Sequence, residues 1–275
     1  MHVELLHKDH FISNYKIFRP HGQLSRYVEC FWETDFTDVF KHQPGGFCNV
    51  FLPNVGYTYL IHLGTPFSLE LNGSSFSIKT DAFVPRNHAA IVRHRLGNHV
   101  FGIKFRVSPI YLLRDVNFFE YRNFIFPLTY LFDDIIIKEV KSATSFQQRV
   151  EIVCSYYNRI IKAKKETAAV RLVGNILYGW QNESNFDGSI KQVGVAHKVN
   201  TRVLRGYFET TIGISPKQAF QIVRMRKAIE RLLMDPASFD LSSFSYHNKS
   251  HFLRHLKAFL ADSRVDPSLI SNMLP

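Results

Sequence analysis

The chain has 275 residues, of which 45% are hydrophobic and 14% aromatic, enough to build a substantial core and two domains. Its formal net charge of +11 favours a polyanionic partner such as nucleic acid or an anionic membrane surface. No apolar run approaches the roughly 18 residues that span a bilayer, and the N-terminal residues MHVELLHKDH lack the apolar segment of a signal peptide. The three cysteines, Cys30, Cys48 and Cys154, are too far apart for a disulfide framework or a zinc cluster. We therefore expect a cytoplasmic protein with reduced thiols, and no membrane partner.

The first 107 residues are predicted to form β-strands. Short runs rich in β-branched and aromatic residues alternate with turn formers such as Asn-Val-Gly, Gly-Thr-Pro and Asn-Gly-Ser. Several short strands at this spacing are typical of a small barrel or sandwich. Trp32, Phe47 and Tyr59 are expected to fill its interior, and a pocket for one small ligand is the alternative use of such side chains. The runs cover residues 15–20, 27–36, 57–64, 67–73, 75–80, 90–95 and 99–107.

Residues 108–165 are predicted to form a helical connector. Ser108 and Pro109 have the form of a helix start, and residues 145–181 show helical apolar periodicity interrupted by an exposed junction at 162–166. One apolar stripe in this segment is a candidate dimer seam, and packing within its own domain is an equal alternative. The stripe consists of Val150, Val153, Cys154, Tyr157, Ile160 and Ile161.

Residues 166–275 are predicted to form a basic, all-helical domain. From residue 189 onward, thirteen Lys and Arg stand against six Asp and Glu, so this part holds most of the excess positive charge. Two capped amphipathic helices are expected there, one following Asn200 and ending at Gly213, the other following Asn248. In each, the apolar residues fall within an arc of about 120°. They are Val203, Leu204, Tyr207, Phe208 and Ile212 in the first helix, and Phe252, Leu253, Leu256, Phe259 and Leu260 in the second.

A short helix and a turn are predicted before each amphipathic helix, at 189–199 and 240–247. This order of elements is that of a helix-turn-helix unit. A long helix, with Ser215 as N-cap and Pro216 at its first position, would join the two units. Three basic residues of this long helix are expected on a solvated face: Arg224, Arg226 and Lys227.

Two such units joined by one long helix resemble the AraC/XylS family of bacterial transcription regulators. The resemblance rests on TRVLRGYF, IGISPKQ and RMRKA, followed by DLSSFSYHNKSHFLRHLKAF, within residues 189–275. It implies an α+β protein with a cupin-like β-barrel that senses an effector or mediates dimerisation (residues 1–107), the helical connector and a C-terminal all-α double helix-turn-helix domain. The partners it implies are double-stranded promoter or operator DNA, a small-molecule effector, a second copy of the chain and, for an activator, RNA polymerase.

Several positions depart from the family pattern. Lys198 occupies a turn position where Gly is common, the interval 240–250 is one residue short, and the acidic segment 262–267 replaces a Gly-x-x-Pro. The family's usual Gly, Asp and Phe in the second unit are replaced by Ser245, Asn248 and Leu256. We therefore expect the second unit to sit differently in its groove or to contribute mainly backbone contacts.

DNA contacts are predicted on the outer faces of the two amphipathic helices. Arg can pair bidentately with guanine O6 and N7 or hold a phosphate, and both uses remain open. An ordinary solvated helix face is the alternative for each side chain. The predicted contacts are Thr201, Arg202 and Arg205 in the first unit, and Lys249, Ser250, His251, Arg254 and Lys257 in the second.

The sequence predicts no catalytic, cofactor or metal site, and hence no enzyme. It contains no Gly-rich phosphate loop and no Ser/His/Asp or Cys/His order with a supporting local motif. A cupin-type enzyme with a helical accessory domain is the main alternative, followed by a nucleic-acid repair protein and an RNA-binding module. The histidines of the β domain have irregular spacing and no nearby acid, unlike a metal site; they are His42, His62, His88, His94 and His99.

Overall fold

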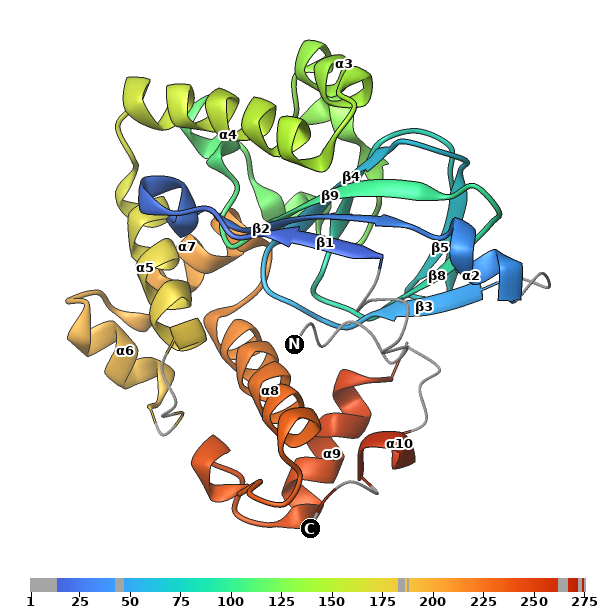
Figure 1. Ribbon diagram of the computed structural model, residues 1–275. Coiled ribbons are helices and arrows are strands. Elements are labelled where there is room, and N and C mark those ends of the chain that lie inside the picture. Colours follow the sequence, from blue (N-terminus) through green and yellow to red (C-terminus); the bar gives the residue numbers. More distant parts are fainter. Residues whose placement is uncertain are drawn as a thin grey trace.

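The computed structural model describes residues 14–42, 47–182, 186, 188–261, 267–271 and 274. Most strands lie in the first part of the chain and most helices in the rest; α3 and α4 lie above the β domain in Figure 1, α5 to α7 at its left, and α8 to α10 below it. The N-terminal decapeptide and residues 262–266 of the acidic segment lie outside the described residues.

The described strands form two antiparallel sheets. The larger has the order β1-β2-β9-β4-β7-β10 and the smaller the order β3-β8-β5-β6. The larger sheet comprises β1 (Tyr15–Phe18), β2 (Val28–Asp35), β9 (His99–Phe105), β4 (Tyr57–His62), β7 (Ala82–Pro85) and β10 (Phe126–Pro127). The smaller sheet comprises β3 (Phe47–Phe51), β8 (Ala90–His94), β5 (Phe67–Leu71) and β6 (Ser74–Ile78). A 3-10 turn, η1 (Gly22–Arg26), precedes β2, and helix α2 (Thr37–His42) follows it.

An apolar layer joins the inner faces of the two sheets. Trp32 and Leu60 of the larger sheet pack there with Phe67 and Val92 of the smaller one. Gly102 lies directly against the Trp32 indole, so a side chain at this position would displace the ring. The β domain and the interior place of Trp32 are thus confirmed, whereas Tyr59 packs on the opposite face of its sheet, against Phe105 and the connector. The side chain of Phe47 is outside the described set.

The connector consists of 3-10 turns followed by helices. Its turns are η2 (Pro109–Leu112), η3 (Phe118–Tyr121) and η4 (Leu128–Tyr130), and its helices are α3 (Asp134–Ser142) and α4 (Phe146–Ala163). The Ser-Pro start at residue 108 therefore opens only one 3-10 turn, in which Ser108 accepts from the backbone N–H of Ile110. Helix α5 (Ala168–Asn182) follows the exposed junction that the sequence predicts.

The apolar stripe of α4 is used inside the chain. Val150, Val153 and Tyr157 are at most 1% exposed and belong to the main core. A buried ion cluster adds to this packing, because Arg149 of α4 contacts the carboxylate of Glu33 on β2 at 3.0 Å. Of the two alternatives for this stripe, packing within the chain is therefore the one observed.

The last part of the chain contains two helix-turn-helix units. The first is α6 (Ile190–Ala196) and α7 (Thr201–Ile212), and the second is the 3-10 turn η5 (Ser242–Phe244) and α9 (Lys249–Phe259). The long helix α8 (Pro216–Met234) joins them, and the short helix α10 (Ser268–Ser271) follows. Asn200 and Asn248 cap α7 and α9 as predicted, each accepting a hydrogen bond of 2.8 Å from a backbone N–H.

The first helix of the second unit is shorter than the sequence predicts. Instead of a helix over residues 240–247 there is one 3-10 turn, η5. Asp240 accepts hydrogen bonds from the backbone N–H of Ser242 and from the hydroxyls of Ser242 and Ser243. Such side-chain bonds offer the backbone an alternative to the helical ladder, which explains the difference.

Both turns keep a left-handed residue although neither has the glycine that is usual in the family. Lys198 has φ = 55° and Ser245 has φ = 54°. A side chain in this region costs roughly 1–2 kcal/mol. Gly194 faces the first of these turns, and a Cβ there would lie 2.7 Å from the Val199 carbonyl oxygen.

Replacing Lys198 by Gly should therefore stabilise the protein. We expect a gain of about 0.5–1 kcal/mol, because relief of left-handed strain exceeds the added entropy of the unfolded chain. Lys191→Gly, in helix α6, is the matched control and should destabilise by about 1 kcal/mol. Chemical denaturation measures both, and a Lys198→Gly variant less stable than the wild type would contradict the strain argument.

Candidate nucleic-acid interface

Helix α7 presents three of the predicted contact residues to solvent. Leu204 and Phe208 are fully buried, and Phe208 packs on Trp180 of α5 at 5.7 Å. This packing leaves Thr201, Arg202 and Arg205 exposed. Arg205 contacts Glu209 one turn later at 2.7 Å, but an exposed pair of this kind contributes only about 0.3–0.5 kcal/mol. A phosphate can therefore compete for the Arg205 guanidinium.

Helix α9 exposes four of its five predicted contact residues. Phe252 and Leu256 are fully buried and orient the helix. The opposite side exposes Lys249, Ser250, Arg254 and Lys257, while His251 is half-buried.

Helix α7 leads into the first residues of α8, whereas α9 lies alongside α8 (Figure 1), where His255 Nδ1 is 3.2 Å from Nη2 of Arg224. Helix α7 runs directly into α8 through Gly213, which has the left-handed φ of 78°. Helix α9 packs on α8 together with η5. Both predicted contact helices are therefore held in place by the same long helix, α8.

The prediction that Arg224, Arg226 and Lys227 lie on a solvated face of α8 is wrong. Arg224 is only 9% exposed and lies over the Tyr246 ring at 4.5 Å. Arg226 donates to the backbone carbonyl of Pro53 at 3.0 Å, and Lys227 lies 6.0 Å from the Phe186 ring. These side chains are covered because α8 is packed by helices on several sides and by the β domain. Arg224 is four residues after the core-facing Phe220 and four before the buried Ala228, and this spacing could have revealed it.

A histidine cluster, His247, His251 and His255, lies beside Arg224. The rings of His251 and His255 are 4.5 Å apart, and Arg224 Nη2 is 3.2 Å from His255 Nδ1. Partial burial, Arg254, Arg224 and His247 lower the pKa of His251. Burial and the positive charges of Arg224, His251 and Arg254 lower the pKa of His255. Both rings are therefore poised to gain a proton when an anion approaches.

The interior of the β domain contains a small cavity. Its volume of about 20 Å³ has room for roughly one water molecule. Most of its wall is apolar, and two of its polar residues, Asn49 and His94, are hydrogen-bonded to each other at 2.9 Å. A ligand larger than water would need these side chains to move.

A larger cleft separates the β domain from α8 and α9. Its volume is about 360 Å³. The β domain contributes Pro53, Asn87, His88 and Ala89, and the two helices contribute Gln218, Gln221, Ile222, Met225, His255, Ala258 and Phe259. No local sequence pattern predicts this cleft, because its walls are far apart along the chain.

The histidines of the β domain do not converge. His94 is held by Asn49 and Asn98, His99 contacts Glu33 at 3.2 Å, and both ring nitrogens of His62 are buried without a partner in the described part of the chain. His88 lines the cleft, and the side chain of His42 is not described. Within the described ranges, no three His, Cys, Asp or Glu side chains are grouped to hold a metal ion.

The described helices include none long and apolar enough to cross a membrane.

Comparison with known proteins gives structural neighbours only. No family model matches the chain, and no curated protein does. The chain is similar to ToxT from Vibrio cholerae with a bound unsaturated fatty acid, at 12% identity and a TM-score of 0.47 over 95% of this chain and 96% of that one. For ToxT from Vibrio cholerae bound to (E)-4-(8-methylnaphthalen-1-yl)but-3-enoic acid, the identity is 13% and the TM-score 0.45, over 96% of this chain and 100% of that one. For the AraC-like transcriptional activator CuxR, the identity is 12% and the TM-score 0.28, over 85% of this chain and 91% of that one.

The structure itself confirms the predicted fold class. An N-terminal β domain is followed by a helical region in which one long helix joins two helix-turn-helix units. This is the arrangement that the AraC/XylS resemblance implies.

The histidine cluster predicts a pH dependence of stability. Because folding lowers the pKa of His251 and His255, the unfolded chain binds more protons as the pH falls through their ordinary value of about 6.5. The free protein should therefore lose stability between about pH 7.5 and pH 5.5, above the range where carboxylates titrate. Denaturation midpoints at the two pH values measure the loss.

The double variant His251→Gln/His255→Gln should lose less stability over this interval than the wild type. His21→Gln, an exposed position of the β domain, is the control and should behave like the wild type. An equal loss in the double variant would assign the effect to other groups, such as the buried His62.

Proposed function

We propose that this protein is a sequence-specific DNA-binding transcription regulator. One observation carries the proposal: two capped helices, each with a buried apolar face and an exposed basic face, pack on the same long helix, α8. Side chains at the exposed faces read base edges and hold phosphates, and the phosphate contacts supply most of the affinity.

The residues proposed to contact DNA are those predicted from the sequence. All of them lie on two capped helices, and all but the half-buried His251 are exposed, which supports this assignment. They are Thr201, Arg202, Arg205, Lys249, Ser250, His251, Arg254 and Lys257. The proposed division of the chain is a sensing or dimerisation domain at residues 1–107, a connector at 108–165 and a DNA-binding domain at 166–275.

The β domain is proposed to respond to a small-molecule effector or to a second copy of the chain. A binding site inside it would require the cavity to expand, whereas the cleft against α8 and α9 is already roomier. The proposed setting is the cytoplasm, with RNA polymerase as a further partner if the regulator is an activator.

A genome-wide DNA pull-down with purified protein, read by sequencing, tests the proposal. The expected result is one enriched motif, whose half-site arrangement reports the stoichiometry. Enrichment no greater than in a control without protein would refute the proposal. A stoichiometric metal together with turnover of a substrate would instead favour the cupin-type enzyme.

Arg202→Ala and Arg254→Ala should damage binding without damaging the fold. Both side chains are exposed, so the melting temperature should stay nearly unchanged. Loss of a base contact should lower discrimination at one position by about 1–3 kcal/mol. Loss of a phosphate contact should weaken binding to all sequences alike and reduce the salt slope by about one unit. Binding isotherms at several salt concentrations distinguish the two cases.

We expect the larger loss of specificity from Arg202→Ala, because the first unit is closer to the family pattern. Arg95→Ala removes an exposed arginine from a turn of the β domain and should leave binding unchanged. If Arg254→Ala matches this control while Arg202→Ala is damaged, helix α9 is structural and only the first unit reads DNA.

A further inference from the structure

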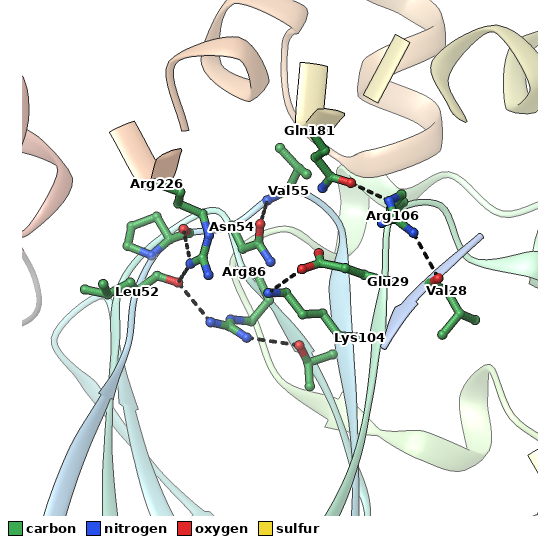
Figure 2. A network of polar contacts seen from close by, with 12 residues as sticks. Val28, Glu29, Leu52, Asn54, Val55, Arg86, Lys104, Arg106, Gln181 and Arg226 are labelled. Carbon is green, nitrogen blue, oxygen red and sulfur yellow. Dashed lines mark hydrogen bonds and ion pairs between the residues drawn. The ribbon is translucent and has the colours of Figure 1, made fainter. Parts of the chain in front are cut away.

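Glu29 lies on a β-bulge at the edge of the domain junction. Opposite β9, Val28 pairs with Phe105 and Cys30 with Lys104, so Glu29 is the extra residue of β2. A bulge re-aims the side chain of the inserted residue. Here the Glu29 carboxylate contacts the ammonium of Lys104 at 3.0 Å, and the Lys104 side chain is only 2% exposed (Figure 2).

Three positive charges from different parts of the chain act on this carboxylate. Burial alone would raise the pKa of Glu29, but Lys104, Arg106 and Arg226 lower it to about 2. The carboxylate is therefore ionised at any physiological pH. Its second oxygen, Oε2, is buried and has no hydrogen-bond partner in the described part of the chain.

The two arginines of this cluster also connect the β domain to the helices. Arg106, just after β9, donates to the Val28 carbonyl at 3.0 Å and to the side chain of Gln181 on α5. Arg226 of α8 donates to the carbonyls of Leu52 and Pro53 at 3.4 and 3.0 Å. Figure 2 shows both guanidinium groups reaching the junction from opposite sides of Glu29.

The Glu29 charge permits these contacts to coexist. Without it, Lys104, Arg106 and Arg226 would repel one another in a region of low dielectric constant. Of the three, Arg226 belongs to helix α8, whereas Lys104 lies on β9 and Arg106 directly after it. Withdrawal of Arg226 would break the contact between α8 and residues 52–53.

The contact of Arg226 with residues 52–53 holds the β domain beside α9, the second proposed recognition helix. The cleft next to it is lined by Asn87 and His88 of the β domain and by His255 and Ala258 of α9. Ala258 is exposed and follows the proposed contact Lys257 directly. A DNA strand following the groove past α9 would approach this rim of the β domain.

We propose that Glu29 is the internal counter-ion of a clamp that holds the β domain against α8 and beside α9, and thereby restricts access of a duplex to α9. The proposal rests on the proposed function. Opening the clamp separates the rim at residues 87–88 from α9 while α8 keeps the two helix-turn-helix units together.

The test compares Glu29→Gln, which removes the charge at constant shape, with the wild type. The probe is a duplex selected from a random pool by the wild-type protein. We expect Glu29→Gln to bind it about fivefold more tightly or better, the usual scale of such coupling. Backbone hydrogen exchange should become faster at residues 52–54 and along α8.

Two further variants separate a clamp from a general loss of stability. Arg226→Gln breaks the clamp from the helix side and should give the same gain, with no further gain in the double variant. Glu29→Gly leaves a carboxylate-sized gap, and acetate should restore wild-type exchange and affinity to it where chloride at equal ionic strength does not. Glu70→Gln, which removes the partner of Arg93 on the smaller sheet, is the matched control and should change neither readout.

The outcomes distinguish this proposal from the proposed function. If the wild type selects no duplex, the proposed function fails. If the wild type binds the duplex and Glu29→Gln binds it equally or more weakly, only the clamp is overturned. This holds even if backbone hydrogen exchange becomes faster in Glu29→Gln. Additive gains from Glu29→Gln and Arg226→Gln, or rescue by chloride, would likewise overturn it.

Discussion

The burial of helix α8 on several faces is the constraint on which the rest of the structure depends. Ala219, Ala228, Ile229 and Leu232 are completely enclosed, and the surrounding core runs without interruption from the β domain to the last helices. Burial on this scale is the main stabilising term available to the chain. Because both helix-turn-helix units pack on α8, their mutual placement follows from its core and not from the loops between them.

Packing around α8 and the sheets also divides the arginines into buried and exposed ones. Those that α8 or the sheets cover have found acceptors or rings: Arg86 binds the Leu52 carbonyl at 2.9 Å, and Arg224 covers Tyr246. Burying a cation without such partners would cost several kcal/mol. Arg202 and Arg254 instead remain at the surface of capped helices. Arginines of the first kind are occupied inside the molecule, whereas Arg202 and Arg254 can meet an external anion.

Local signals in the sequence were sufficient for the two amphipathic helices α7 and α9 and for the long helix α8. Caps at Asn200 and Asn248 and the apolar spacing of α7 and α9 are properties of consecutive residues, so they could be predicted. Strand β7 has four residues ending in Pro85 and β10 only two, too short for a periodicity, and both were missed. The partners of Arg226 are more than 170 positions away along the chain, and no local pattern encodes them. The left-handed Lys198 and Ser245 show that the tertiary context imposes the turn where the preferred residue is absent.

The segment at residues 51–54 is where the two halves of the molecule meet most directly. Phe51 lines the cavity of the β domain, and the guanidinium of Arg86 lies 4.7 Å from its ring. Arg86 and Arg226 share the Leu52 carbonyl as an acceptor. Arg86 therefore contacts both the Phe51 ring and the carbonyl that also accepts from Arg226 of α8. The wall of the cavity and helix α8 are thus joined through Phe51, Arg86 and the Leu52 carbonyl.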